Sequence, residues 1–295
     1  MESAMTIKTI LAAASGGSAS DGAIELACRF ARRFGAHLEG FHARPDPRDL
    51  FTYSGDGFGM SISGEFIDRF VKDADAIATK TKAAFTAAAA RHQIPLSAAP
   101  SLQIPDKTGA SAAWRDDTGY GPTLIARRAR FFDLTVLGRS ERVVDQPHTD
   151  VVEQTLIHSG RPVLLAPAKP PAEVGETIAV GWNGSAEATR AVVGALPFLA
   201  VARAVSIITV GEKHQESVAA LVEYLGWHSV KATHRHVAAI PGVGPGQQLL
   251  SGARDGNADL LVMGGYGHMP WREFFFGGAT REVVGTSLLP LLISH

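Results

Sequence analysis

The feature that most constrains this fold is a set of short sequences that occurs twice along the chain. The first copies are Lys8-Thr-Ile-Leu, Phe132-Asp-Leu-Thr-Val-Leu-Gly and Ser159-Gly-Arg-Pro-Val-Leu-Leu. The second copies, in the same order, are Glu176-Thr-Ile-Ala, Ala258-Asp-Leu-Leu-Val-Met-Gly and Ser287-Leu-Leu-Pro-Leu-Leu-Ile. Two copies of one architecture are therefore expected within the 295 residues.

Each copy alternates short apolar runs with segments whose apolar residues recur at helical spacing. The strands expected from the apolar runs are residues 7–14, 36–42, 110–115, 133–138 and 162–166, then 177–181, 205–210, 230–239, 260–263 and 290–294. The helices expected between them are residues 23–34, 64–91, 123–130 and 151–157, then 185–199, 215–225, 246–254 and 280–286. Gly35 is expected to end the first helix, and Ser185 to cap a later one. Residues 45–62 and 96–109 are expected to be loops.

This alternation predicts an α/β fold of two tandem doubly wound, Rossmann-like domains, each with a five-stranded parallel sheet flanked by helices. The proline-rich connector at residues 166–175 is the best boundary between them. The predicted domains are residues 1–168 and 169–295. The apolar strand at 290–293 is expected to pair along its edge, either within the chain as a pseudo-dimer or between chains as a homodimer.

Composition describes an ordinary globular protein, with 45% hydrophobic and 19% charged residues. Lys plus Arg number 28 and Asp plus Glu 29, a formal charge of −1 that indicates neither a nucleic-acid nor an anionic-membrane partner. No apolar run approaches the roughly 20 residues of a membrane helix. The single cysteine, Cys28, lies in an apolar helical pattern, which predicts a buried structural thiol and agrees with the reducing cytoplasm.

The segment from residue 261 to 281 carries the chemistry that the sequence suggests. Gly264, Gly265 and Gly267 follow a buried strand, and Gly277 and Gly278 open a helical pattern. Glycine lets backbone N–H groups approach a ligand, and a helix N-terminus offers unpaired N–H groups with a positive dipole end. In a parallel sheet, the ends of the two strands leading to Asn183 and Gly264 would flank the ligand crevice. The segment is therefore a candidate cradle for phosphates.

The spacing Gly264-x2-Gly267-x9-Gly277 resembles the nucleotide-binding loop of the universal stress protein family, in the subgroup that holds ATP. The whole chain resembles two such proteins fused head to tail, with the adenine nucleotide alpha hydrolase-like fold. The family has Ser or Thr where Gly278 stands, and Thr280 lies two residues further on. The resemblance implies binding of ATP or AMP, with Mg²⁺ beside a triphosphate, and a role in stress response as a sensor or adaptor.

The resemblance also implies which residues contact the nucleotide. The family commonly has Asp where Asn183 stands, contacting the adenosine end. Trp182 would either contact the ligand or pack against the other domain. The implied cofactor-binding residues are Gly181, Trp182, Asn183, Val210, Met263, Gly264, Gly265, Gly267, His268, Gly277, Gly278, Ala279 and Thr280. No catalytic set accompanies His268, and no metal-ligand spacing occurs, so at most slow ATP hydrolysis is expected.

The first copy is expected to be degenerate. Gly138 is retained, but Glu141 replaces the second glycine and would repel phosphates. Two alternatives to nucleotide sensing remain open. The first is a nucleotide-free assembly module, which Gly278 and Asn183 favour. The second is an enzyme that uses the Ser15-Gly16-Gly17 turn, which resembles the S-G-G-x-D-S loop of ATP pyrophosphatases with Ala19 in place of its Asp. A plain strand-to-helix turn with caps explains the same residues.

Overall fold

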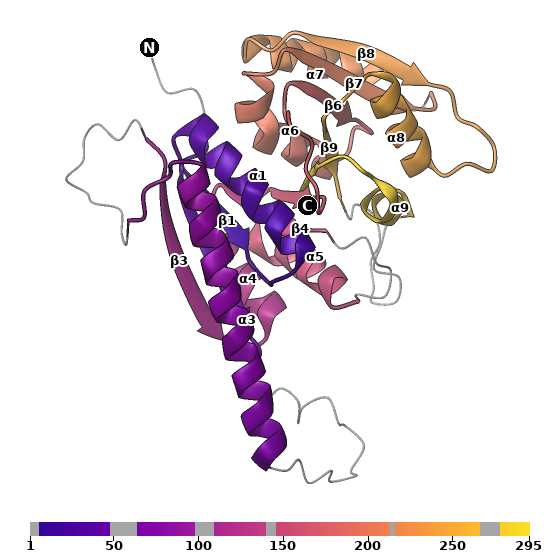
Figure 1. Cartoon of the computed structure of the whole chain (residues 1–295). Coiled ribbons are helices and arrows are strands. Elements are labelled where there is room, and N and C mark those ends of the chain that lie inside the picture. The colour runs from indigo at the N-terminus through magenta and orange to yellow at the C-terminus, as the bar shows by residue number, and fades with distance from the viewer. Residues whose placement is uncertain (1–5, 48–63, 98–108, 140–145, 213–215, 266–277) are drawn as a thin grey trace.

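The computed structural model describes residues 6–47, 64–97, 109–139, 146–212, 216–265 and 278–295. Strands and helices alternate within each half, and β5 is followed directly by β6 where the halves join (Figure 1). The first half contains β1 (Thr9–Ala13), α1 (Ser18–Phe34), β2 (His37–Arg44), α3 (Gly64–Arg91), β3 (Ser111–Thr118), α4 (Gly121–Ala129), β4 (Leu134–Gly138), α5 (Gln146–Ser159) and β5 (Val163–Ala166). The second half contains β6 (Thr177–Gly181), α6 (Ala186–Leu199), β7 (Ala204–Val210), α7 (Glu216–Trp227), β8 (Ala232–Val237), α8 (Pro245–Asp255), β9 (Leu260–Gly264), α9 (Gly278–Thr286) and β10 (Leu291–Ser294).

The ten strands form one continuous sheet in the order β3-β2-β1-β4-β5-β10-β9-β6-β7-β8. All pairs within each half are parallel, so each half has the doubly wound five-stranded sheet that the sequence predicts. The halves meet where β5 and β10 pair antiparallel, with Leu164 opposite Leu292. The sequence left open how this edge pairs, and the structure pairs it within the chain. The predicted boundary after residue 168 lies in the connector from β5 to β6 and stays a prediction.

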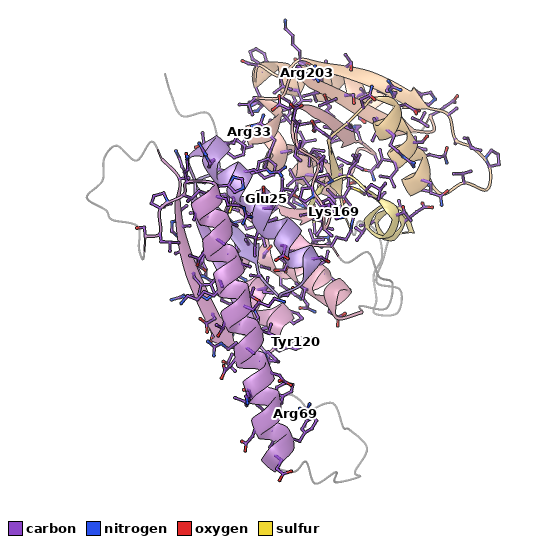
Figure 2. The ribbon with its side chains drawn as sticks, in the orientation of Figure 1. Glu25, Arg33, Arg69, Tyr120, Lys169 and Arg203 are labelled. Atoms are coloured by element: carbon purple, nitrogen blue, oxygen red, sulfur yellow. The ribbon has the colours of Figure 1, made fainter. Side chains whose placement is uncertain are left out.

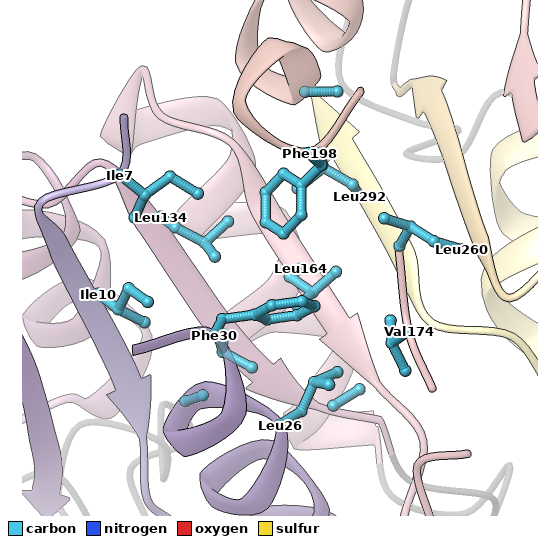
Figure 3. Packing of buried hydrophobic residues seen from close by; sticks show 14 of the residues in the cluster. Ile7, Ile10, Leu26, Phe30, Leu134, Leu164, Val174, Phe198, Leu260 and Leu292 are labelled. Atoms are coloured by element: carbon cyan, nitrogen blue, oxygen red, sulfur yellow. The ribbon is translucent and has the colours of Figure 1, made fainter. Parts of the chain in front are cut away.

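Two hydrophobic layers cover the two faces of the sheet, and each layer spans both halves. On one face, α1, α3, α6 and α7 pack over β-strand residues such as Leu164 and Leu260; on the other, α4, α5, α8 and α9 pack over residues such as Leu165 and Leu261. The halves join on the first face, where the Phe198 ring meets Phe30 edge-on at 4.9 Å between centroids (Figure 3). The chain is thus a three-layer sandwich with a shared core.

The repeated sequences make the same hydrogen bonds in both halves. Asp133 accepts from the backbone N–H of Thr9 at 3.0 Å, and Asp259 accepts from the N–H of Thr177 at 3.0 Å. In each case the carboxylate holds the first residue of the first strand of its half, β1 or β6, by a hydrogen bond. The repeated serines, Ser159 and Ser287, likewise accept from the N–H two residues on, at 3.1 and 3.0 Å. The repeated residues therefore make equivalent hydrogen bonds in both halves, the aspartates between segments far apart in the chain and the serines within a turn.

Several boundaries differ from those expected. Helix α1 begins at Ser18, five residues before the expected start at Ala23, because its polar first turn hides the helical period. Gly35 ends α1 in the left-handed conformation at φ 64°, as predicted, and Ser185 caps α6 through a 3.2 Å bond from the Ala188 N–H. Most residues of the loops expected at 45–62 and 96–109 lie outside the described part of the chain.

The connector between the halves is held by two arginines of α1. Arg29 donates to the carbonyls of Pro171 and Ala172 at 2.6 and 3.2 Å. Arg33, which Figure 2 shows at the end of α1 facing the second half, donates to the Val174 carbonyl at 3.0 Å and pairs with Glu176 at 3.1 Å. The connector is therefore bonded to the first half before β6 begins. Cys28 on the same helix is buried, which confirms the predicted structural thiol, and burial raises the pKa of this thiol to about 12.

Candidate functional site

The topological switch point of the second half lies between β6 and β9. From β6 the chain runs outward to β7 and β8, then returns to the other side of β6 to form β9 and β10. Gly181 and Met263 are partners in the β6–β9 register, so both strands end at the same place. Ligands of open α/β sheets bind at the carboxyl ends of strands at such a point. The structure thus brings together the two predicted segments around Asn183 and Gly264.

The segment after β6 forms a hydrogen-bonded turn into α6. The Asn183 side-chain oxygen accepts from the Ser185 N–H at 3.1 Å, and Asn183 itself is exposed. The Trp182 indole N–H donates to Ser217 Oγ of α7 at 2.9 Å. Trp182 is thus anchored to a helix of its own half, an arrangement that neither of its two expected roles described. Val210, at the end of the neighbouring β7, is half-buried on the α8 side of the sheet.

The glycines at the end of β9 and directly after it are required by packing. A Cβ on Gly264 would lie 2.5 Å from the Ala188 backbone nitrogen and 2.6 Å from the Glu187 carbonyl carbon, both in the first turn of α6. A Cβ on Gly265 would lie 2.6 Å from Ile293 Cγ2, and the Gly265 N–H donates to the Ser294 carbonyl at 2.9 Å. The predicted contact of these glycines with a ligand stays a prediction, and their close packing is a second reason for glycine that the sequence alone does not reveal. Their positions do not depend on a ligand.

Gly138 makes the equivalent approach in the first half. A Cβ on it would lie 2.5 Å from the carbonyl carbon of Ala19 and 3.0 Å from the Ser20 nitrogen, in the first turn of α1. The glycine is retained in the first half, where the rest of the predicted motif is absent. Gly138 and Gly264 therefore share one structural reason, the close passage of a helix over a strand end. Any chemical difference between the two halves therefore lies in residues other than this glycine.

A carboxylate occupies the N-terminal turn of α6, and sequence reasoning missed it. The Glu187 side chain accepts a hydrogen bond from its own backbone N–H, which lowers its pKa although burial raises it; Ser185, Arg190 and His295 also lower it. Arg190 pairs with it at 3.0 Å. Anions are therefore unfavourable at this helix end, because the carboxylate already uses the positive end of the dipole. The signal available in the sequence was the acidic residue in the first turn after Ser185.

The N-terminus of α9 lies beside the end of β9. Gly278, Ala279 and Thr280 form its first turn, and Thr280 is buried against Gly265. The first N–H groups of a helix have no partner within it. Glu282 of α9 also accepts from the Gln247 N–H at 3.2 Å, which fixes α9 against the start of α8. The first turn of α9 contains no acidic residue, whereas Glu187 occupies the first turn of α6 and Glu282 bonds to the first turn of α8.

Part of the predicted site lies outside the described residues. Gly267, His268 and Gly277 fall there, as does Glu141 in the first half. The expected turn at Ser15-Gly16-Gly17 is present, but Gly17 is the N-cap of α1 and no side chain caps the helix. His234 bonds to Thr209 at 2.9 Å, and the described residues contain no cluster suited to a metal ion.

The fold is shared by known structures along nearly the whole chain. A universal stress protein from Archaeoglobus fulgidus DSM 4304 matches with a TM-score of 0.68 at 15% identity, over 97% of this chain and 97% of that one. A protein of Pseudomonas aeruginosa UCBPP-PA14 assigned to the universal stress proteins matches with a TM-score of 0.55 at 14% identity, over 98% and 93%. A functionally unknown protein of Pseudomonas aeruginosa PAO1 matches with a TM-score of 0.52 at 13% identity, over 98% and 92%.

These matches define the class of the fold. The chain has the α/β fold of the universal stress proteins, with its architecture present twice. No protein-family model matches the sequence, and no curated protein matches it. Within the described residues, no helix is both long and apolar enough to cross a membrane.

Proposed function

We propose that this protein binds an adenine nucleotide, ATP or AMP, through its second half and acts in stress response as a nucleotide sensor or adaptor in the cytoplasm. Mg²⁺ accompanies the nucleotide when it is a triphosphate. The observation that carries the proposal is the pairing of β6 with β9, which brings the ends of both strands to one switch point. The loop spacing that resembles the ATP-holding subgroup begins at this point.

Each part of the nucleotide has a proposed place. The exposed Asn183 amide contacts the adenosine end, with Gly181 and Trp182 at the rim and Val210 beside the base. The phosphates take the N–H groups of Gly278, Ala279 and Thr280, at the positive end of the α9 dipole. They stay away from the start of α6, where the Glu187 carboxylate repels them. A sensor role fits these proposed contacts, because hydrogen bonds and a helix dipole hold a nucleotide but do not activate water.

The first test is the ligand itself. Freshly purified protein is denatured, and any released small molecule is identified by chromatography and mass spectrometry. Calorimetric titration with adenosine, AMP and Mg²⁺–ATP then compares wild type with Ala279→Asp and Asn183→Ala. Ala279→Asp adds a carboxylate to the first turn of α9, so it should weaken AMP and ATP at least about tenfold while leaving adenosine unchanged. Asn183→Ala removes one hydrogen bond, which is about a fivefold loss for all three ligands.

Ala83→Asp is the matched control, because it makes the same substitution on the exposed side of α3. Binding that weakens equally in the control would reflect net charge alone and would contradict the site. A wild type that binds none of the three ligands would favour the nucleotide-free assembly module. Release of pyrophosphate from ATP would favour the enzyme alternative at Ser15-Gly16-Gly17.

A further inference from the structure

Helix α8 has no side chain of its own at its start to accept hydrogen bonds. Its N-cap is Gly244, no side chain caps the helix there, and its first turn contains no acidic residue. Glu282 of α9 supplies an acceptor instead, because its carboxylate accepts from the Gln247 N–H at 3.2 Å. The two helices pack against each other (Figure 1). A side chain of α9 therefore caps α8.

Two glycines at the start of α8 leave room for this carboxylate. A Cβ on Gly244 would overlap the Glu282 carboxylate, and a Cβ on Gly246 would lie 2.7 Å from Glu282 Oε2. The Cβ on Gly246 would also lie 2.7 Å from the carbonyl oxygen of Ala279, in the first turn of α9. The start of α8 therefore lies directly against the first turn of α9.

This contact holds the turn to which the proposed function assigns the phosphates. Residues 278–280 form the first turn of α9, and Glu282 follows in the same helix. The bond between Gln247 and Glu282 ties α9 to α8, and α8 packs on the sheet through buried residues such as Leu249 and Ala253. A contact outside the proposed ligand site thus directs the N–H groups that open α9.

The first half has no carboxylate at the equivalent position. Glu282 lies five residues before the repeated Ser287, and Gln154 lies five residues before Ser159. The N-cap of α4, the helix that corresponds to α8, is Tyr120 in place of a glycine. The sequence that resembles a nucleotide-binding loop and the carboxylate that holds its helix therefore occur in the same half.

We propose that Glu282 is a positioning residue for the phosphate group of the nucleotide. The role rests on the proposed function, because it concerns the same turn of α9. The hydrogen bond from Gln247 holds the N–H groups of residues 278–280 in the orientation that a phosphate requires, and Glu282 does not touch the ligand. Donors bind a charged group well when neighbouring residues hold them within about 0.5 Å of the required geometry. Glu282 therefore acts on the phosphate and not on the adenosine end.

The test is a calorimetric titration of the whole chain with adenosine, AMP and Mg²⁺–ATP. Glu282→Ala removes the acceptor and should weaken AMP and ATP about tenfold, with adenosine unchanged. Glu282→Gln keeps a carbonyl oxygen that can accept from Gln247, so its AMP affinity should stay within about threefold of wild type. Gly246→Ala displaces the same turn from the α8 side through its contact with Ala279 and should also weaken AMP and ATP.

Glu223→Ala is the matched control, because it removes an exposed carboxylate from α7 in the same half. It should leave the affinity for all three ligands unchanged. Gly244→Ala is a second variant in case Glu282→Ala does not fold: the atoms nearest to its Cβ all belong to the Glu282 side chain, which it should displace from Gln247. Chemical denaturation of each variant measures the free energy of unfolding and shows which variants are folded during the titration.

Three outcomes would overturn the positioning role while the proposed function stands. They are wild-type AMP affinity in Glu282→Ala, an equal loss of adenosine affinity in that variant, and a loss of AMP affinity in Glu282→Gln as large as in Glu282→Ala. A wild type that binds neither AMP nor ATP would refute the proposed function and the positioning role together. Selective loss of AMP and ATP in Glu282→Ala, with affinity retained in Glu282→Gln, is the expected result.

Discussion

Replacing Gly264 by alanine tests whether this glycine is required for the stability of the fold or for binding a ligand. The new Cβ would lie 2.5 Å from the Ala188 nitrogen and 2.6 Å from the Glu187 carbonyl carbon. Both are backbone atoms and cannot swing aside as a side chain would. Because ordinary contact begins near 3.4 Å, the end of β9 and the first turn of α6 must separate by about 1 Å. Overpacking of this kind costs about 1–3 kcal/mol, and backbone contact on both sides favours the upper end.

Gly138→Ala provides an internal comparison, because its Cβ meets Ala19 and Ser20 in the same manner. The free energy of unfolding, measured by chemical denaturation with circular dichroism, should fall by a similar 2–3 kcal/mol in each variant. The double variant should show the sum, since the two glycines lie in different halves. Gly226→Ala is the control: nothing lies within 4 Å of its Cβ, and alanine in a helix is favourable by about 0.5–1 kcal/mol.

The reasoning fails if Gly264→Ala unfolds at the wild-type midpoint. A variant of full stability that nevertheless loses nucleotide would mean that the glycine is needed by the ligand and that β9 can move away from α6 at no cost. If only Gly138→Ala were destabilised, the equivalence of the two helix–strand contacts would be wrong. Equal losses in both would support one structural reason for the two glycines.

Two further predictions concern ionised side chains. Arg128 donates to both carboxylate oxygens of the buried Glu39, at 2.7 and 2.6 Å. Arg128→Ala leaves the Glu39 charge buried without a partner, so the free energy of unfolding should fall by about 3–5 kcal/mol. The double variant Glu39→Gln/Arg128→Met removes both charges and should recover much of this loss when the variants are compared by chemical denaturation. Burial raises the pKa of Glu25, but hydrogen bonds from His92, Arg29 and Arg91 outweigh it and lower the pKa below its usual value of 4.5. The stabilisation by the ionised Glu25 carboxylate is therefore complete above about pH 4.5 and is lost as the pH falls through its folded-state pKa. In Glu25→Gln, the free energy of unfolding, measured by chemical denaturation between pH 3 and 6, should depend less on pH than in wild type. An unchanged profile in Glu25→Gln would contradict the assignment.

The sequence predicted the order and type of the elements well, because apolar periodicity is a local property. It placed α3 at the same limits as the structure, Gly64–Arg91, since that helix carries a long unbroken pattern. It ended β3 at Arg115, whereas the strand runs to Thr118, because pairing with β2 extends it through polar residues. The pairing of β5 with β10 was beyond sequence reasoning, since an exposed apolar edge fits a partner in the same chain or in another.

The candidate site shows a different limit. A glycine pattern indicates positions where another group comes close to the backbone. The sequence does not show whether that group is a ligand or another part of the chain. Gly264 and Gly265 prove to touch α6 and β10, contacts that join residues far apart in the chain. Glu187 is visible in the sequence, yet its effect on the site depends on where α6 begins relative to β9. Residues whose role depends on such distances are the ones that a sequence leaves undecided.

The two halves share several structural residues and differ in the first turns of α1 and α6. Both retain the strand-end glycine, the aspartate that fastens the first strand and the serine before the last strand. These residues are therefore explained by the fold alone. The first turns of α1 and α6 differ: one has Gly17, Ala19 and an unpartnered Ser20, and the other has Ser185, Glu187 and Ala188. A charge at a helix end changes which ligands can approach without disturbing the packing beneath. Specialisation of the two halves through these turns requires no change in their shared core.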